Sequence, residues 1–425
     1  MHIGWLQNRW VHNSAKLLSA NVIAQVIGIC VYPLLTRLYT PADFGLFNLF
    51  LSIGGVLLLF ATGEFYSAIV LPKHASQAQA CFQVGMVCNV VVTLLCLLSV
   101  PFAAYIANLF NAPILADWYY LLPFYVFVMA SWQLLNYWYI RHKQFGFISS
   151  YQVGQSVLNA SLKSVFGWLG WLQGGLIVAS LLAPLLSLCG VLAASYRSCQ
   201  SLLRLRWHTM RQMAVAYRKF PQYSLPKSVV NYIGGNLPVL LLSPFFSLSD
   251  IGYFGMATTL SFLPLSLVAK SFNQVLFSFF AQKVNQQASV YGYYVRFGGA
   301  WLVVLAVGLL GLYGWLPWLT QTLLGASWQP VGTYIQYMLP WLGVVTLTNT
   351  FDFWLDIFKQ QDKQFYVEVL LLLMRTLVLL WAIHRQNFAF AVMGFSLVSC
   401  LVRVGYAAYQ YYLVSQYEKN RCNCN

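Results

Sequence analysis

Apolar segments long enough to cross a membrane recur along the whole chain, and short polar stretches separate them. Each segment has roughly 20 residues or more, and a helix of that length spans a hydrocarbon core of about 30 Å. The short alternating segments typical of a membrane β-barrel do not stand out. The sequence therefore predicts an all-α polytopic membrane protein with about 12 transmembrane helices, at 15–38, 44–70, 82–107, 116–140, 147–169, 172–195, 222–246, 251–280, 296–319, 331–357, 364–384 and 388–414.

The composition agrees with this pattern. Of 425 residues, 60% are hydrophobic and 8% are charged, and the mean hydropathy is +0.65. A soluble domain carries about 25% charged residues. So few charges leave too little polar surface to face water, so lipid must be the solvent for most of the chain.

The net charge of +15 is explained by where the basic residues fall. With the N-terminus inside, the external segments hold only Arg37 and Arg385. The cytoplasmic segments hold seventeen: Arg9, Lys16, Lys73, Arg141, Lys143, Arg197, Arg204, Arg206, Arg211, Arg218, Lys219, Lys283, Arg296, Lys359, Lys363, Lys419 and Arg421. This bias follows the positive-inside rule and predicts that both termini are cytoplasmic. It also argues against nucleic acid as a partner.

A basic segment near mid-chain divides the predicted helices into two sets of six. We expect an N-terminal lobe at 1–195, a cytoplasmic linker at 196–220 and a C-terminal lobe at 221–425. Six is an even number, so both lobes enter the membrane in the same direction. A parallel repeat of this kind is typical of transporters, which open the cleft between two lobes alternately to each side.

Internal similarity supports the repeat. Asp43, Gly45 and Phe47 reappear 207 residues later at the same spacing as Asp250, Gly252 and Phe254. With a few inserted residues, three further pairings keep their order: Leu122–Phe124 with Leu339–Trp341, Tyr137–Trp138 with Phe353–Trp354, and Lys143–Phe145 with Lys363–Phe365.

Several of these stretches resemble one family. The sequence looks like the opening of Wzx-type O-antigen and capsule flippases of the polysaccharide transporter family, within the multidrug/oligosaccharidyl-lipid/polysaccharide (MOP) superfamily. The similarity covers about the first 160 residues and is only architectural beyond them. It is carried by Leu17–Asn21, Pro33–Gly45, Ala68–Lys73 and Leu135–Arg141 with Lys143.

The resemblance implies a V-shaped, two-lobed bundle like that of multidrug and toxin extrusion (MATE) transporters, in the bacterial inner membrane. It implies translocation of an undecaprenyl-pyrophosphate-linked oligosaccharide from the cytoplasmic to the periplasmic leaflet. A polysaccharide polymerase and a chain-length regulator would be expected partners of such a protein.

Ionisable residues inside apolar helices give the candidate site, because charges at bilayer depth are costly and usually face a cavity or a partner. Arg37, Lys163, Lys270 and Arg375 are candidates to bind the pyrophosphate through charge-assisted hydrogen bonds. Two plainer interpretations remain open, namely side chains that reach the interface and ion pairs that only hold helices together.

Three acids are candidates for gating or ion coupling: Glu64, Asp352 and Asp356. The repeat places Glu64 at nearly the same depth as Lys270, so these two could pair across the cleft when substrate is absent. Asp352 and Asp356 are four residues apart and would share a helical face. They could take up H⁺ or Na⁺, or instead pair with Lys359 and Lys363.

No cofactor is predicted, and Cys422 and Cys424 lack the further ligands that a metal site requires. A polysaccharide polymerase is an alternative function, but the external loops look too short to carry its catalytic groups. A multidrug or organic-cation antiporter of the same superfamily is the other alternative. The basic excess inside the membrane favours an anionic cargo over a cationic one.

Overall fold

A computed structural model describes residues 20, 22–203 and 207–423. Every one of the twelve predicted segments overlaps a helix within these ranges, and the described residues contain no β-strand. Seven of the described helices are long and apolar enough by themselves to cross a membrane. The prediction of an all-α polytopic membrane protein is therefore confirmed.

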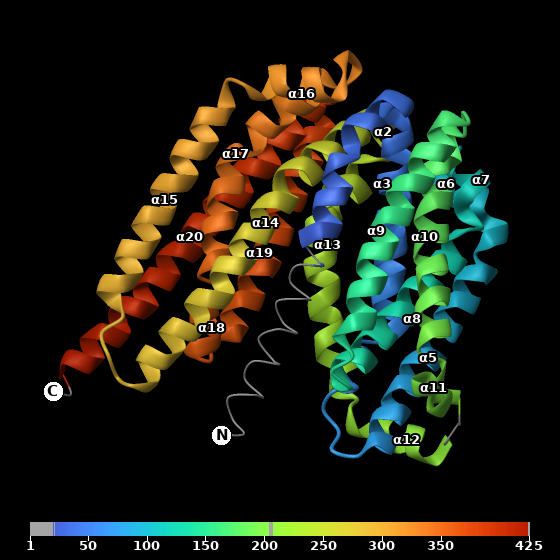
Figure 1. Ribbon diagram of the computed structural model, residues 1–425. Coiled ribbons are helices and arrows are strands. Elements are labelled where there is room, and N and C mark those ends of the chain that lie inside the picture. Colours follow the sequence, from blue (N-terminus) through green and yellow to red (C-terminus); the bar gives the residue numbers. More distant parts are fainter. Residues whose placement is uncertain (1–19, 21, 204–206, 424–425) are drawn as a thin grey trace. The chain divides into compact units, whose positions relative to one another are not determined.

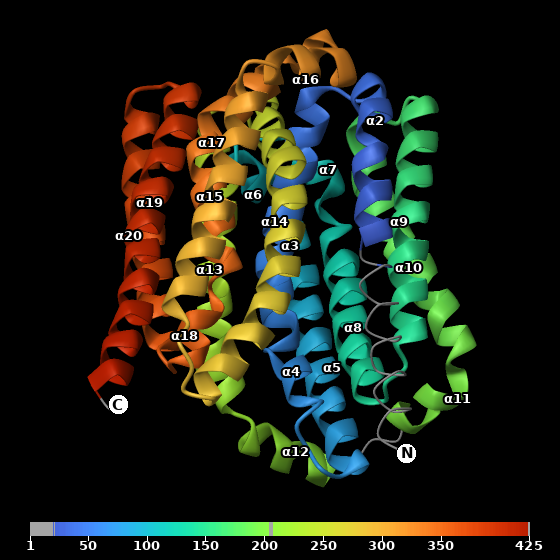
Figure 2. The ribbon, with the colours of Figure 1, turned by 60° about the vertical axis from the view of Figure 1, so that its left-hand side comes forward.

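The chain divides by internal contacts into two compact units, with the boundary after Pro244. The first unit contains a helical stretch at 22–30 followed by α2 (Tyr32–Leu38), α3 (Pro41–Thr62), α4 (Phe65–Ala68), α5 (Ala75–Leu98), α6 (Ala103–Leu109), α7 (Leu115–Tyr119), α8 (Leu122–Arg141), α9 (Phe145–Trp168), α10 (Leu172–Ala194), α11 (Tyr196–Cys199), α12 (Trp207–Ala216) and α13 (Leu225–Leu242). In Figures 1 and 2, α9 lies against α10 and beside α2.

The second unit contains α14 (Leu248–Asn285), α15 (Tyr291–Tyr313), α16 (Leu316–Leu324), α17 (Gln329–Thr350), α18 (Phe353–Ile357), α19 (Gln361–His384) and α20 (Phe388–Asn423). The last two helices run side by side over most of their length (Figure 2). An aromatic core that includes Phe280, Phe353 and Trp354 packs around the short helix α18.

Helix α13 packs on α3 in the first unit, whereas the sequence placed it in the C-terminal lobe. The Tyr232 hydroxyl donates a hydrogen bond to the Leu51 carbonyl oxygen at 3.2 Å. Gly55 makes this approach possible, because a Cβ atom there would collide with the Tyr232 hydroxyl. The assignment of helices to two six-helix lobes stays a prediction.

The 207-residue repeat is visible in how two helices begin. Thr40 caps α3, since its hydroxyl accepts a hydrogen bond from the Asp43 amide and its own amide donates to the Asp43 carboxylate. Ser247 caps α14, and its hydroxyl accepts a hydrogen bond from the Asp250 amide at 3.1 Å. The repeated Ser/Thr-x-x-Asp motif therefore starts α3 and α14 through the same capping contact.

Later in each half the spacing becomes 216 residues. Lys143 and Lys359 both have φ of 57° and end the helix before them, and α9 and α19 each contain 24 residues. This spacing keeps the predicted match of Trp138 with Trp354. It moves one other match, because Lys143 corresponds to Lys359 rather than Lys363. Pro123 lies in the first turn of α8 whereas Pro340 lies inside α17, and the match of Leu122–Phe124 with Leu339–Trp341 stays a prediction.

Candidate functional site

One face of α9 is polar although the helix is otherwise apolar. Gln152, Ser156, Asn159 and Lys163 follow one another at intervals of four, three and four residues, which places all four on the same side of a helix. At a rise of 1.5 Å per residue, this polar face of α9 extends about 16 Å along the helix. That is about half of a ~30 Å hydrocarbon core.

Lys163 lies at one end of the polar face of α9 and is half-buried. Its Nζ atom is 4.4 Å from the centre of the Phe47 ring on α3, which is a cation–π distance. The backbone is held from the other side, since the Tyr39 hydroxyl donates to the Lys163 carbonyl oxygen at 2.7 Å. Among the residues that the structure describes, no carboxylate forms a salt bridge with Lys163.

The helical stretch at 22–30 contacts α9. The Ser156 hydroxyl donates to the Ala24 carbonyl oxygen at 2.6 Å, and Gln25 follows directly. Asn48 follows Phe47 on α3. Three buried side-chain atoms of the first unit lack a hydrogen-bond partner within the described chain: Gln25 Oε1, Asn48 Nδ2 and Gln152 Oε1. Such atoms are costly unless water or a ligand satisfies them.

The second unit carries charged side chains on α19 and α20, and these side chains have partners. Arg403 on α20 donates from Nη2 to Glu368 Oε1 on α19 at 2.7 Å. Arg375 on α19 donates from Nε to the Ser399 hydroxyl at 2.8 Å, and its guanidinium lies 4.4 Å from the centre of the Phe395 ring. Both arginines are buried, since Arg375 is 6% and Arg403 is 9% exposed.

Asp352 extends this network to the break between α17 and α18. One oxygen of its carboxylate accepts a hydrogen bond from the Tyr406 hydroxyl on α20, and the other accepts from Gln364 Nε2 on α19 at 2.8 Å. Asp356, one turn further along α18, is exposed. The two acids therefore lie in different surroundings, although the sequence suggested that they share one face and act alike.

The 216-residue spacing relates the two networks. It matches Gln152 with Glu368, Asn159 with Arg375, and Lys163 with Leu379. It also matches two residues of the first unit with charged residues of the second: Asn136 with Asp352 and Ser187 with Arg403. Four of these five positions hold a neutral polar residue in the first unit and an acidic or basic residue in the second, while Lys163 and Leu379 are the reverse. The helix arrangement itself therefore does not require the ion pairs.

The other predicted residues belong to three different parts of the sequence. Arg37 is exposed on α2, and Lys270 is exposed on the 38-residue helix α14. Glu64 is buried just beyond α3, with φ of 62° and one carboxylate oxygen that lacks a partner in the described chain. A complete span of 22 residues separates Pro41 from Glu64, so Glu64 lies at a helix end rather than deep within a helix.

The sequence-based selection of site residues missed Gln152, Ser156, Glu368 and Arg403. The regular spacing of polar residues along α9 was available as a signal. The pairing of Glu368 with Arg403 was not, because 35 residues separate them and only the packing of α19 on α20 brings them together.

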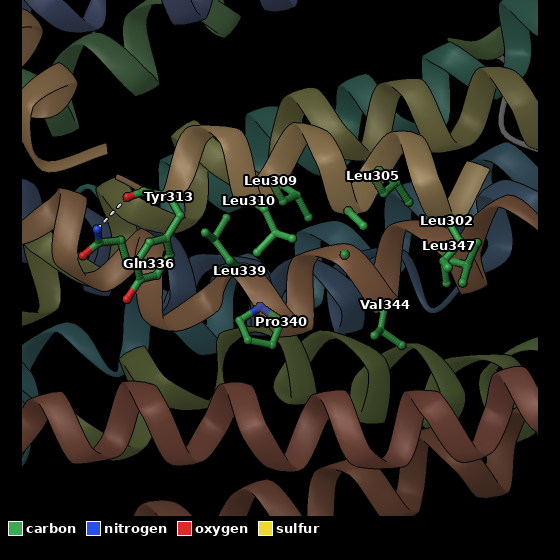
Figure 3. Close-up of a pocket in the computed structure, with 12 residues that line it drawn as sticks. Leu302, Leu305, Leu309, Leu310, Tyr313, Gln336, Leu339, Pro340, Val344 and Leu347 are labelled. Atoms are coloured by element: carbon green, nitrogen blue, oxygen red, sulfur yellow. Dashed lines mark hydrogen bonds between the residues drawn. The ribbon is translucent and has the colours of Figure 1, made fainter. Parts of the chain in front are cut away.

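An apolar groove of about 410 Å³ lies between α15 and α17 (Figure 3). Leucine side chains such as Leu305, Leu309 and Leu339 line it, and Pro340 forms part of its wall. At one end Gln336 donates from Nε2 to the Tyr313 carbonyl oxygen at 2.7 Å, so its amide is already engaged. The groove therefore offers apolar surface almost exclusively.

The fold is that of known membrane transporters. It matches an inward-facing multidrug resistance MATE family transporter of the MOP superfamily with a TM-score of 0.70 and 13% identity, covering 95% of this chain and 96% of the other. It matches the lipid II flippase MurJ, in an inward closed conformation, with a TM-score of 0.71 and 14% identity, covering 94% and 90%. The chain is thus a multi-pass membrane protein with a MATE-like fold.

Sequence comparison gives the family. The polysaccharide biosynthesis protein family matches residues 34–332, and the chain belongs to it. A curated relative, the succinoglycan biosynthesis transport protein ExoT of Rhizobium meliloti (strain 1021), is 22% identical over 321 residues, which are 75% of this chain and 61% of that relative. The chain therefore spans less than two thirds of the length of that relative. The predicted resemblance to polysaccharide flippases is confirmed.

Proposed function

We propose that the protein is a flippase that moves an undecaprenyl-pyrophosphate-linked oligosaccharide from the cytoplasmic to the periplasmic leaflet by alternating access. The observation that carries the proposal is the family match over residues 34–332 on a chain with a transporter fold. A relative named as a succinoglycan biosynthesis transport protein agrees with it. We place the protein in the bacterial inner membrane with both termini in the cytoplasm, because of the positive-inside charge bias.

Lys163 is the best placed of the four predicted cations to bind the pyrophosphate. It is a half-buried ammonium group with an aromatic ring beneath it and without a carboxylate salt bridge in the described chain. An anion that leaves water can replace part of its hydration with this charge. Arg37 and Lys270, which are exposed, would act at the entrance or exit of the path. Arg375 is buried against Ser399 and Phe395 and would act through the network around it.

Asp352 is the best placed of the predicted acids for coupling to an H⁺ gradient. Its carboxylate accepts hydrogen bonds from Tyr406 and Gln364 and interacts electrostatically with Arg403 and Glu368, so a change in the charge of Asp352 also acts on that ion pair. Glu64 would act as a gate at the end of α3, and Asp356, which is exposed, would contribute less. A polymerase and a chain-length regulator remain the proposed partners.

Deletion of the gene tests the proposed function. We expect surface polysaccharide to disappear and lipid-linked units to accumulate on the cytoplasmic side, with recovery when the wild-type gene is restored. Lys163→Met should fail to restore polysaccharide, whereas Lys227→Met, which removes an exposed cation from α13, should restore it. Accumulation of unpolymerised units in the periplasmic leaflet would instead indicate a polymerase. Normal polysaccharide with new sensitivity to cationic drugs would indicate an antiporter.

A further inference from the structure

Acidic residues are absent from the middle of the sequence. No Asp or Glu occurs between Asp117 and Asp250, although ten Lys and Arg residues do. Three of these cations, Arg211, Arg218 and Lys219, lie on α12 or directly after it, and all three are exposed. None of the three forms a salt bridge with a carboxylate in the described part of the chain. The positive charge around α12 is therefore left for a partner outside this chain.

Helix α12 is held against the first unit at the level where α5 begins. Met210 of α12 is buried, and Met210 and Tyr217 pack on the same apolar core as Cys81 of α5. Just before α12, the Leu202 carbonyl oxygen accepts a hydrogen bond from Gln83 Nε2 of α5 at 3.0 Å. Cys81 and Gln83 lie in the first three turns of α5, which starts an apolar membrane span. The position of α12 is therefore at the membrane boundary rather than far out in water.

The exposed side of α12 combines cations with apolar surface. Trp207, Arg211 and Val215 follow one another at intervals of four residues, which places them on one side of the helix. Trp207 is 73% exposed and Val215 is 60% exposed. Tryptophan is enriched where a membrane meets water, because its ring is apolar and its N–H is polar. Helix α12 also runs across the end of the first unit rather than along α5 (Figures 1 and 2), as a helix on a membrane surface does.

We propose that the exposed side of α12, together with Arg218 and Lys219, binds anionic phospholipid headgroups of the cytoplasmic leaflet. The inference uses the orientation proposed above and does not depend on the cargo. The cations complement the phosphate charge and can donate charge-assisted hydrogen bonds to it. Trp207 and Val215 would enter the boundary between headgroups and acyl chains. A soluble acidic partner would match the cations alone, so the lipid surface accounts for more of this face.

Binding of two phospholipids by the purified full-length protein in detergent tests the inference. The probes are phosphatidylglycerol, which is anionic, and phosphatidylcholine, which is zwitterionic, and dissociation constants come from the rise of the unfolding midpoint during titration. We expect the wild type to bind phosphatidylglycerol more tightly. Arg211→Gln with Arg218→Gln should weaken that binding by about 10- to 30-fold and leave phosphatidylcholine unaffected. Arg296→Gln with Lys419→Gln, which removes two exposed cations from the second unit, should leave both nearly unchanged.

Salt supplies a second readout, because screening weakens attraction between exposed charges. The affinity of the wild type for phosphatidylglycerol should fall as salt is raised, and that of the double α12 variant should fall less. Lys219→Gln, a single change beyond the end of α12, should weaken binding by about 3- to 5-fold and serves if the double variant does not fold. Equal binding of the two lipids by the wild type would overturn the inference and favour an acidic protein segment as the partner. Equal weakening by the α12 variant and the second-unit variant would also overturn it.

Discussion

Separating Arg403 from Glu368 tests whether the ion pair of the second unit is structural. Their nitrogen and oxygen atoms are 2.7 Å apart, and the side chains are 11% and 22% exposed. Charges about 4 Å apart attract each other by about 4 kcal/mol at an effective dielectric constant of 20. Removing one partner of a buried pair typically costs about 3–5 kcal/mol, because the other charge is left uncompensated. Since Glu368 is partly exposed, we expect Glu368→Gln to destabilise the protein by about 2–4 kcal/mol.

The double variant is the sharper test. Glu368→Gln combined with Arg403→Ser recreates the neutral Gln152 and Ser187 found at the matching positions of the first unit. We expect it to recover most of the lost stability, because no unpaired charge remains. The assay is reversible unfolding in mixtures of mild detergent and SDS, followed by tryptophan fluorescence. Additive effects of the two substitutions, or no effect of either alone, would refute the view that the two charges are needed only for each other.

Three further predictions follow from local contacts. Thr40→Ala and Ser247→Ala each remove a helix cap and should each lower stability by about 1 kcal/mol in the same unfolding assay; unequal effects would show that the repeated caps are not equivalent. Gly55→Ala should destabilise α3 against α13 by about 1–3 kcal/mol, and Tyr232→Phe should relieve part of the cost by removing the hydroxyl that collides. Lys163→Arg should keep more flippase activity than Lys163→Met in the polysaccharide assay, because it preserves the positive charge; equal loss would argue against electrostatic binding.

Helix positions could be predicted from sequence because each span needs a long apolar run, and that run is visible residue by residue. The ends of helices were less predictable. The predicted helix at 44–70 ends at Thr62, where Gly63 and then Glu64 take up the left-handed conformation. The predicted helix at 331–357 is broken at Phe351 and Asp352. Neither break involves a proline, so little in the amino-acid pattern predicts them.

The candidate site was less predictable than the fold because burial and partners depend on packing between distant segments. Lys270 lies in an apolar run like Arg375, yet Lys270 is exposed whereas Arg375 is 6% exposed. Hydropathy gives the length of a helix but not the side that faces lipid. Lys163 on α9 contacts Phe47 on α3, although 116 positions separate them in the sequence. Nothing in a single sequence predicts that these two residues lie close together.

Divergence between the repeats explains why one unit carries charges where the other carries amides. Helices α9 and α19 have the same length, and each follows a lysine with a positive φ. Polar residues at the matching positions can therefore differ without a change in the backbone. In the second unit, Arg403 and Arg375 are balanced by Glu368 and Asp352, so the group is close to neutral when all four are charged. Protonation of Asp352 leaves one positive charge in excess and must strengthen binding of any anion nearby. By linkage, binding of that anion must then favour protonation of Asp352.

If this network is coupled to the cargo, Asp352→Asn should reduce the dependence of transport rate on pH. A transport rate that varies with pH equally in Asp352→Asn and in the wild type would exclude Asp352 as the coupling group.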